Sequence, residues 1–270
     1  MITMKSGRKR RGARLGQHFL TGEWAAQKLA QSIAVQPDEV ILEIGPGKGA
    51  LTRELLSTGA RVIAVEKDEA LVTHLSETFA HEIASGRLIL LSGDIRDFSP
   101  LRLNLNLGGY VVAANIPYYI TGEIIRQFLS TDAPPRAMAL LVQKEVAERI
   151  IARDHKESIL SLSVKVYGTP KIIAKVSKGN FSPPPSVDSA IIVIDTISKE
   201  AFAKVPEHAF FKVVKTGFAS KRKFLANNLA RGFSKRVVER ALADCGLEAN
   251  VRAEDVPLEK WKELAQKLTD

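Results

Sequence analysis

The sequence has a single cysteine and no long apolar run. With only Cys245, the chain can form no intrachain disulfide and no cysteine-rich zinc site, which favours a reducing compartment. No apolar run approaches the roughly 18 residues that suggest a membrane-spanning helix. The basic N-terminus lacks the following apolar segment of a secretory signal. These absences predict a cytoplasmic protein with no membrane partner and no metal site.

Acidic residues are absent from two stretches that are rich in lysine and arginine. The first fifteen residues carry six cations: Lys5, Arg8, Lys9, Arg10, Arg11 and Arg14. Residues 209–238 carry eight more: Lys212, Lys215, Lys221, Arg222, Lys223, Arg231, Lys235 and Arg236. Removing these fourteen from the total of 39 leaves 25 basic residues against 30 acidic ones. Two separate basic blocks on a nearly neutral body predict that the chain binds a nucleic acid.

The length of 270 residues and the apolar fraction of 45% suit one large domain and one small domain. From Val40 to about Asp195 strand-like and helix-like segments alternate, which predicts βαβ units and a mainly parallel sheet. Helices are expected at Glu23–Ile33, Leu51–Ser57, Glu69–Ala80, Gly122–Leu129 and Lys144–Ala152. Strands are expected at Val40–Ile44, Arg61–Val65, Leu88–Leu91, Tyr110–Ala114, Ala137–Val142, Ile159–Val166, Ile172–Val176 and Ala190–Asp195. The last three follow one another closely, so this edge of the sheet should be antiparallel.

Strand patterns stop after residues 196–198. The segment from Phe210 to Asp270 is typical of several short helices, with breaks at Gly232, Gly246 and Pro257. The boundary should fall near Ile197 to Pro206, which divides the chain into residues 1–200 and 201–270.

A glycine turn follows the first of these buried strands. Gly45, Gly47 and Gly49 lie between that strand and a helix, an arrangement that lets a ligand approach the backbone. The next strand ends in Glu66, about twenty residues further on, where a carboxylate can accept from both hydroxyls of a ribose. Asp94 follows the third strand and could recognise an adenine edge. The pattern predicts an adenosine-containing cofactor, and at this point a nicotinamide dinucleotide also fits.

The segment Asn115-Ile116-Pro117-Tyr118 ends the fourth strand. An exocyclic amino group on a base is a poor nucleophile, because its lone pair is delocalised into the ring. An asparagine carbonyl and backbone carbonyls stiffened by proline could hold its N–H bonds, and a tyrosine face could stack on the base. The segment therefore favours S-adenosylmethionine as the cofactor and the amino group of a base as the methyl acceptor.

Five motifs come in the order and spacing of one enzyme family: Gly16-Gln17-His18-Phe19-Leu20, the segment Glu43–Gly49, Glu66, Gly93-Asp94 and Asn115–Tyr118. The sequence resembles the ribosomal RNA adenine N6-dimethyltransferases over roughly residues 8 to 235, and the segment Phe181–Ser189 continues the match. The resemblance implies a Rossmann-like methyltransferase sheet with a small all-α C-terminal domain, and we expect the protein to be a monomer. It implies that S-adenosylmethionine is converted to S-adenosylhomocysteine. The implied substrate is two adjacent adenines in the 3′-terminal hairpin loop of small-subunit (16S) rRNA, naked or in an immature subunit.

The resemblance also implies roles for individual residues. The cofactor would contact Gln17, His18, Leu20, Glu43, Gly45, Gly47, Gly49, Glu66, Lys67, Asp94, Ile95 and Asn115. The target adenine would lie between Tyr118 and Phe181, with its amino group held by Asn115 and by the carbonyl of Ile116 or Pro117. RNA would contact Arg8, Lys9, Arg10, Arg11, Lys221, Arg222 and Lys223.

Alternative functions differ in the substrate or in whether the protein is an enzyme. Ile116 is also common among the erythromycin-resistance methylases of large-subunit (23S) rRNA, whereas residues 218–229 are more similar to the small-subunit branch. A non-catalytic nucleic-acid-binding factor on the same scaffold is a further alternative, although Glu66, Asp94 and Asn115 are intact. DNA adenine methylases typically have Asp where Asn115 stands.

Overall fold

A seven-stranded sheet forms the centre of the computed structural model, which describes residues 17–269. The strand order is β4-β3-β2-β5-β6-β9-β7. The strands are β2 (Val40–Ile44), β3 (Arg61–Glu66), β4 (Leu88–Ser92), β5 (Tyr110–Asn115), β6 (Ala137–Gln143), β7 (Thr169–Val176) and β9 (Ser189–Asp195). The first five are parallel to one another, and β9 pairs antiparallel with β6 and β7. The predicted parallel sheet with an antiparallel edge is confirmed.

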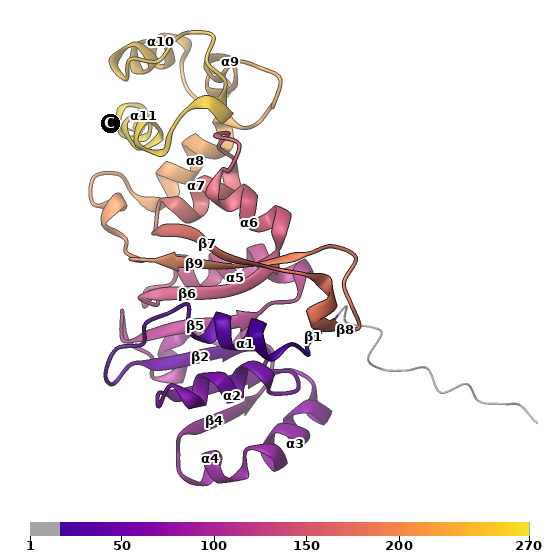
Figure 1. Cartoon of the computed structure of the whole chain (residues 1–270). Helices are drawn as coiled ribbons and strands as arrows, with labels where there is room; N and C mark the ends of the chain where they lie inside the picture. Colours follow the sequence, from indigo (N-terminus) through magenta and orange to yellow (C-terminus); the bar gives the residue numbers. More distant parts are fainter. Residues whose placement is uncertain (1–16, 270) are drawn as a thin grey trace, which may run out of the picture.

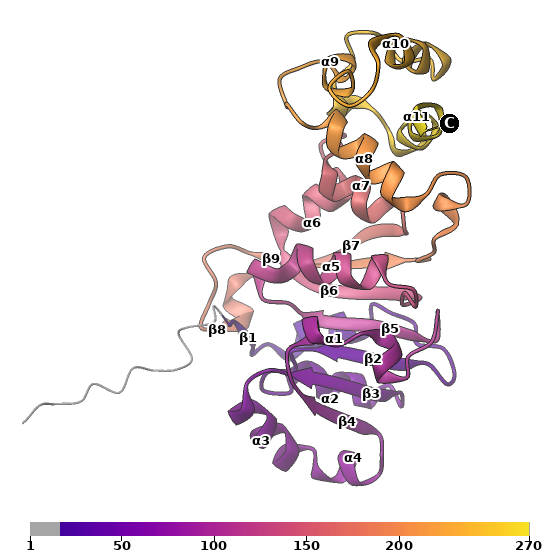
Figure 2. The same ribbon diagram turned by 180° about the vertical axis from the view of Figure 1, so that it is seen from behind.

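Helices cover both faces of the sheet. Figure 1 shows α1 and α2 in front of it, and Figure 2, from behind, shows α5 on the other face. Successive residues of a strand point to opposite faces, so Ile41 packs in the core under α1 and α2, and Leu42 packs in the core under α5. The helices of this part are α1 (Glu23–Ala30), α2 (Ala50–Ser57), α3 (Glu69–Thr78), α4 (Ala80–Ala84), α5 (Thr121–Ser130), α6 (Lys144–Ile151) and α7 (Ile159–Lys165).

A small second sheet joins the start of the described chain to a segment far along the sequence. β1 (Phe19–Leu20) pairs antiparallel with β8 (Phe181–Ser182). The backbone N–H of Thr21 also donates to the carbonyl of Asn180 at 2.9 Å. This pairing fixes the segment 17–20 beside the carboxyl ends of the parallel strands.

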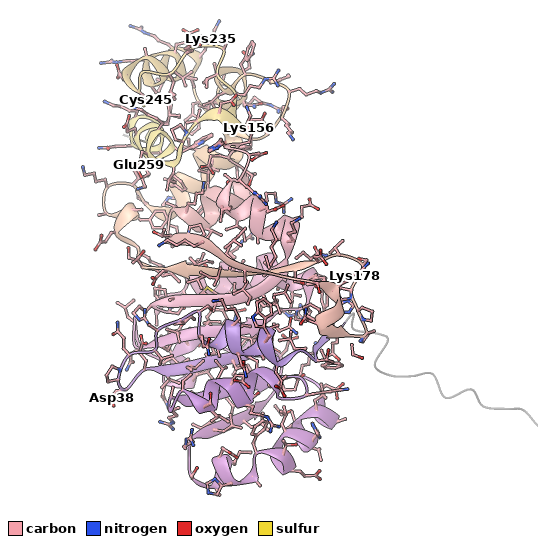
Figure 3. All side chains as sticks on the ribbon, in the orientation of Figure 1. Asp38, Lys156, Lys178, Lys235, Cys245 and Glu259 are labelled. Atoms are coloured by element: carbon pink, nitrogen blue, oxygen red, sulfur yellow. The ribbon has the colours of Figure 1, made fainter. Side chains whose placement is uncertain are left out.

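Only helices follow β9 among the described residues. They are α8 (Glu207–Gly217), α9 (Leu225–Leu229), α10 (Lys235–Asp244) and α11 (Leu258–Thr269), which gather beyond the β7 edge (Figures 1 and 2). Trp261 of α11 is fully buried and stacks on Phe218 with ring centroids 5.4 Å apart. The backbone N–H of Glu157 donates to the carbonyl of Glu254, and Lys156 pairs with Asp255, so the loop before α7 is tied to the helical end (Figure 3). The division into residues 1–200 and 201–270 stays a prediction.

One predicted strand was wrong. The segment Ile159–Val166 alternates apolar and polar residues, but Ile159–Lys165 is the helix α7. Ser158 caps it: the Ser158 hydroxyl accepts from the N–H of Ser161 at 3.1 Å, and the Ser161 hydroxyl accepts from the N–H of Ser158 at 2.7 Å. This reciprocal capping satisfies two N–H groups that a helix start otherwise leaves unpaired. In the described residues no helix has the length and apolar character needed to cross a membrane.

Candidate active site

A cavity opens at the carboxyl ends of β2, β3, β4 and β5. It is lined by segments 17–20, 43–48, 50–51, 65–67, 93–96 and 115–120. Every residue predicted to contact the cofactor lines it except Gly49, which lies just beyond as the N-cap of α2. The parallel strands bring these segments together because their carboxyl ends meet at one edge of the sheet.

The glycine turn has a backbone shape that other residues rarely adopt. Gly45, Gly47 and Gly49 have φ angles of 65°, 60° and 83°. A Cβ on Gly47 would lie 3.0 Å from Phe19, and one on Gly49 would lie 2.5 Å from Phe79. The positive φ therefore favours glycine at all three positions, and close packing adds to this restriction at Gly47 and Gly49.

Glu66 is buried at the end of β3 and accepts three backbone hydrogen bonds. Oε1 accepts from the N–H groups of Lys67 at 2.8 Å and Asp68 at 2.9 Å, and Oε2 accepts from Gly47 at 3.0 Å. A carboxylate has about four acceptor positions. One position, on Oε2, is thus free, and accepting both ribose hydroxyls would require Glu66 to release one backbone N–H.

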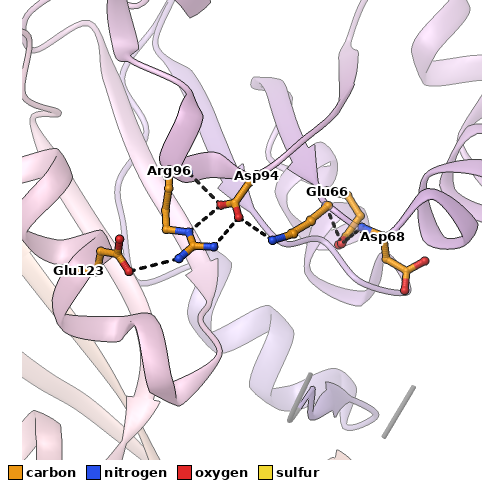
Figure 4. A network of polar contacts seen from close by, with 6 residues as sticks. Glu66, Asp68, Asp94, Arg96 and Glu123 are labelled. Atoms are coloured by element: carbon orange, nitrogen blue, oxygen red, sulfur yellow. Dashed lines mark hydrogen bonds and ion pairs between the residues drawn. The ribbon is translucent and has the colours of Figure 1, made fainter. Parts of the chain in front are cut away.

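Asp94 lies between two cations (Figure 4). Arg96 donates to it from Nε at 3.0 Å and from Nη2 at 2.6 Å, and Lys67 Nζ donates at 2.8 Å. These hydrogen bonds, with that from Arg96 the strongest, hold the pKa of Asp94 well below its usual range despite its burial. Arg96 also lies 3.6 Å from Glu123 of α5, so a chain of charges connects the end of β4 with the helix after Asn115–Tyr118.

Asn115, His18 and Tyr118 meet on the other side of the cavity. Asn115 Nδ2 donates to the backbone carbonyl of His18 at 3.0 Å, which leaves Oδ1 of the amide available as an acceptor. His18 Nδ1 lies 2.8 Å from the carbonyl oxygen of Pro183 and must donate to it, because a carbonyl can only accept. The His18 ring lies 5.7 Å from that of Tyr118, whose hydroxyl is 2.7 Å from Ser189 Oγ. His18 therefore links three predicted motifs.

Phe181 lies near this group but does not line the cavity. It is 4% exposed, and in β8 it is the register partner of Leu20. Stacking on a base would require its side chain to become accessible. Its predicted role remains a prediction.

The RNA-binding candidates lie elsewhere. Lys221, Arg222 and Lys223 are exposed on the turn between α8 and α9 and do not line the cavity. Arg8, Lys9, Arg10 and Arg11 lie outside the described residues. Within the described part of the chain, no group of His, Cys, Asp or Glu side chains is arranged to hold a metal ion.

Several residues that line the cavity were not predicted from the sequence, among them Arg96, Tyr119 and Ile120. Arg96 follows Asp94 by two residues, and this short spacing of opposite charges was the available signal. Tyr119 is 66% exposed at the rim of the cavity. An exposed tyrosine beside a motif that is expected to bind a base was a second signal.

Comparison with known proteins places these features in a family. The profile of the ribosomal RNA adenine dimethylase family matches residues 8–270. The chain is 40% identical to the ribosomal RNA small subunit methyltransferase A of Dehalococcoides mccartyi strain 195, covering 97% of this chain and 89% of the relative. It is 39% identical to the protein of the same name from Deinococcus radiodurans, covering 94% and 84%.

Solved structures share the fold. A dimethyladenosine transferase from Plasmodium falciparum has a TM-score of 0.78 at 23% identity, covering 92% of this chain and 96% of that one. The 23S rRNA methyltransferase ErmE has a TM-score of 0.74 at 24% identity, covering 93% and 100%.

Proposed function

This chain belongs to the ribosomal RNA adenine dimethylase family, and we propose that it transfers methyl groups from S-adenosylmethionine to N6 of two adjacent adenines in the 3′-terminal hairpin loop of small-subunit (16S) rRNA. One observation carries the proposal: Asp94, Glu66, Glu43 and Asn115 lie in a row at the ends of adjacent strands around one cavity. The two curated relatives of 39–40% identity, both named for the small subunit, support this branch of the family.

The strand order suggests how the cofactor lies. Asp94 at β4 suits the adenine, and Glu66 at the neighbouring β3 suits the ribose. The glycine turn after β2 then receives the amino-acid end, and Asn115 after β5 lies next in the row. The residues fit such a ligand because they provide separate acceptors along its length and a backbone turn with no side chains in the way.

Catalysis would rest on positioning the acceptor. The bound cofactor supplies an electrophilic methyl group on a sulfonium. Asn115 Oδ1 would accept from the adenine amino group and aim its lone pair, while Tyr118 would hold the ring. Alignment alone can lower a barrier by about 7–11 kcal/mol in well-oriented reactions. The methylated amino group is then acidic enough to lose its proton to water, so a general base among the side chains is not required.

A second, wider cavity between α5, α6, α7 and α8 is a candidate binding site for the part of the RNA that surrounds the target adenines. Arg126 of α5 and Arg149 of α6 line this cavity. Lys212 and Lys215 of α8 and Lys221 of the following turn also line it. Acidic residues are interspersed, among them Glu145, Glu148 and Glu207. The basic block 209–238 contributes to one wall, which supports phosphate contacts there.

Transfer of labelled methyl groups to four substrates in parallel tests the proposal. The substrates are immature small subunits, naked small-subunit rRNA, large-subunit rRNA and DNA, with the Asn115→Ala variant as the inactive control. We expect transfer to small-subunit rRNA in at least one of its two forms. Transfer to large-subunit rRNA alone would reassign the branch, and no transfer from wild type to any substrate would overturn the proposed activity.

A further inference from the structure

Glu43 is a carboxyl group buried at the base of the cavity without a partner. Its exposed fraction is 0%, and neither Oε1 nor Oε2 has a hydrogen-bond partner among the residues that the structure describes. Glu66 is almost as buried but accepts three backbone N–H bonds. Two carboxyl groups in one cavity therefore have opposite environments.

An ionised carboxylate in the position of Glu43 would be unfavourable. Removing a charge from water is unfavourable, and only a well-placed partner offsets the cost, so an unpaired buried acid takes up a proton instead. The groups that face Glu43 offer little compensation. They are the Thr52 hydroxyl on α2, which is close but makes no hydrogen bond, and the Glu66 carboxyl on β3, which has the same charge. Burial raises the pKa of Glu43 to about 8, with Thr52 lowering it and Glu66 raising it.

We propose that Glu43 is neutral in the free protein and releases its proton to solvent when a ligand with an ammonium group enters the cavity. The inference rests on the proposed function, since the amino-acid end of S-adenosylmethionine carries such a group and is expected over the glycine turn beside Glu43. The ligand keeps its own proton, and the carboxylate formed pairs with the ammonium group, which requires the Glu43 side chain, 0% exposed in the free protein, to turn toward the cavity. Cofactor binding is then linked to proton release, and the affinity rises with pH.

The linkage has a definite sign and size. Glu43 must lose a proton on binding. Below the pKa that Glu43 has in the free protein, the affinity for the ligand therefore rises with pH, by at most tenfold per pH unit. An α-amino group ordinarily titrates at about 7.7–8.0. Measurements about one unit below that range keep the ligand protonated, so the proton released comes from the protein.

Calorimetry in buffers of different ionisation enthalpy counts the protons. S-adenosylhomocysteine carries the ammonium group and cannot donate a methyl group, whereas 5′-methylthioadenosine keeps the adenosine and the thioether and lacks the amino-acid end. We expect close to one proton released with the first compound and close to none with the second. Glu43→Gln, which imitates the neutral acid, should abolish the release. Because this variant leaves His18 unchanged, it also shows whether the released proton comes from Glu43 or from the His18 imidazole in the same cavity.

Infrared difference spectroscopy of the wild type keeps the test independent of that variant. Adding S-adenosylhomocysteine should remove the band of one protonated carboxyl group. Binding without proton release, or release that persists in Glu43→Gln, would overturn the role of Glu43 and leave the proposed function standing. Failure of both compounds to bind, together with absence of methyl transfer, would instead count against the proposed function.

Discussion

Arg96 donates two parallel hydrogen bonds to Asp94, from Nε to Oδ1 at 3.0 Å and from Nη2 to Oδ2 at 2.6 Å. Such forked pairs are strong and geometrically specific. With the additional bonds from Lys67 and from the Arg96 backbone N–H, the acceptor positions of Asp94 are filled. An adenine amino group that donates to Asp94 must therefore displace one of these donors.

Removing this competition should tighten cofactor binding. In Arg96→Gln the displaced bond no longer opposes the adenine, so we expect a gain of about 1 kcal/mol, roughly fivefold in affinity. Calorimetry with 5′-methylthioadenosine measures it, and Asp94→Ala should weaken the same binding. If Arg96→Gln weakens binding as much as Asp94→Ala does, Arg96 is itself part of the adenine site.

Glu66→Ala should weaken the binding of S-adenosylmethionine. Hydrogen bonds to a charged acceptor contribute about 1.5–3 kcal/mol, and the ribose hydroxyls lose theirs. Because Glu66 also accepts from Gly47 and two other N–H groups, the melting temperature should fall too. Glu66→Gln is the matched control, since it keeps the volume and one acceptor oxygen. An unchanged dissociation constant in a folded Glu66→Ala variant would remove this residue from the site.

Asn115→Ala should lower kcat far more than it lowers RNA affinity. The Asn115 side chain lies at the carboxyl end of β5 and donates to the carbonyl of His18, which leaves its Oδ1 free to accept from the amino group that we propose to react. Single-turnover methylation and filter binding of the same RNA separate the two effects. The assigned role is wrong if RNA binding falls as steeply as the methylation rate.

Changing Lys221, Arg222 and Lys223 together to Gln should weaken RNA binding and reduce its dependence on salt. Each phosphate contact contributes about −0.9 to the log–log salt slope on a duplex and about −0.7 on a single strand. The matched control changes Lys171, Lys175 and Lys204, three exposed lysines outside the basic blocks, for the same loss of charge. Cofactor affinity should be unchanged in both variants. If the wild type and the variant of Lys221, Arg222 and Lys223 have equal salt slopes, the RNA does not bind at these three residues.

Glu39→Gln should destabilise the fold by about 1.5–3 kcal/mol at neutral pH, because Glu39 accepts two charge-assisted bonds from Arg136 at 2.5 and 2.9 Å. The hydrogen bond from Arg136 outweighs burial and lowers the pKa of Glu39 in the folded state. Its stabilising effect is therefore complete above the ordinary glutamate pKa of about 4.3 and is lost as the pH falls through the folded-state pKa. Urea unfolding of both proteins from neutral to acid pH measures the difference, which should shrink on acidification. A difference that stays constant with pH would show that the charge of Glu39 does not contribute.

The sequence by itself determined the parallel sheet and most of the candidate site. Glu66, Asp94 and Asn115 could be found because each ends an apolar run, and the carboxyl ends of parallel strands meet at one edge. The glycine turn was equally local, since the positive φ angles at Gly45 and Gly47 restrict the residue type. The prediction for Ile159–Val166 was wrong, because the alternating apolar and polar residues indicated a strand. The Ser158 cap, which starts a helix here, was not recognised in the sequence.

Only the tertiary structure decided which side chains face one another across long stretches of chain. The bond from His18 to Pro183 depends on the pairing of β1 with β8, and nothing local in either segment specifies that partner. The contrast between Glu43 and Glu66 is likewise invisible in the sequence, where both are glutamates near the ends of buried strands. Burial without donors at Glu43, and three backbone N–H groups at Glu66, result from how the turns after β2 and β3 pack. The charge that a carboxyl group carries depends on those surroundings, so the electrostatics of the cavity could be derived only from the folded chain.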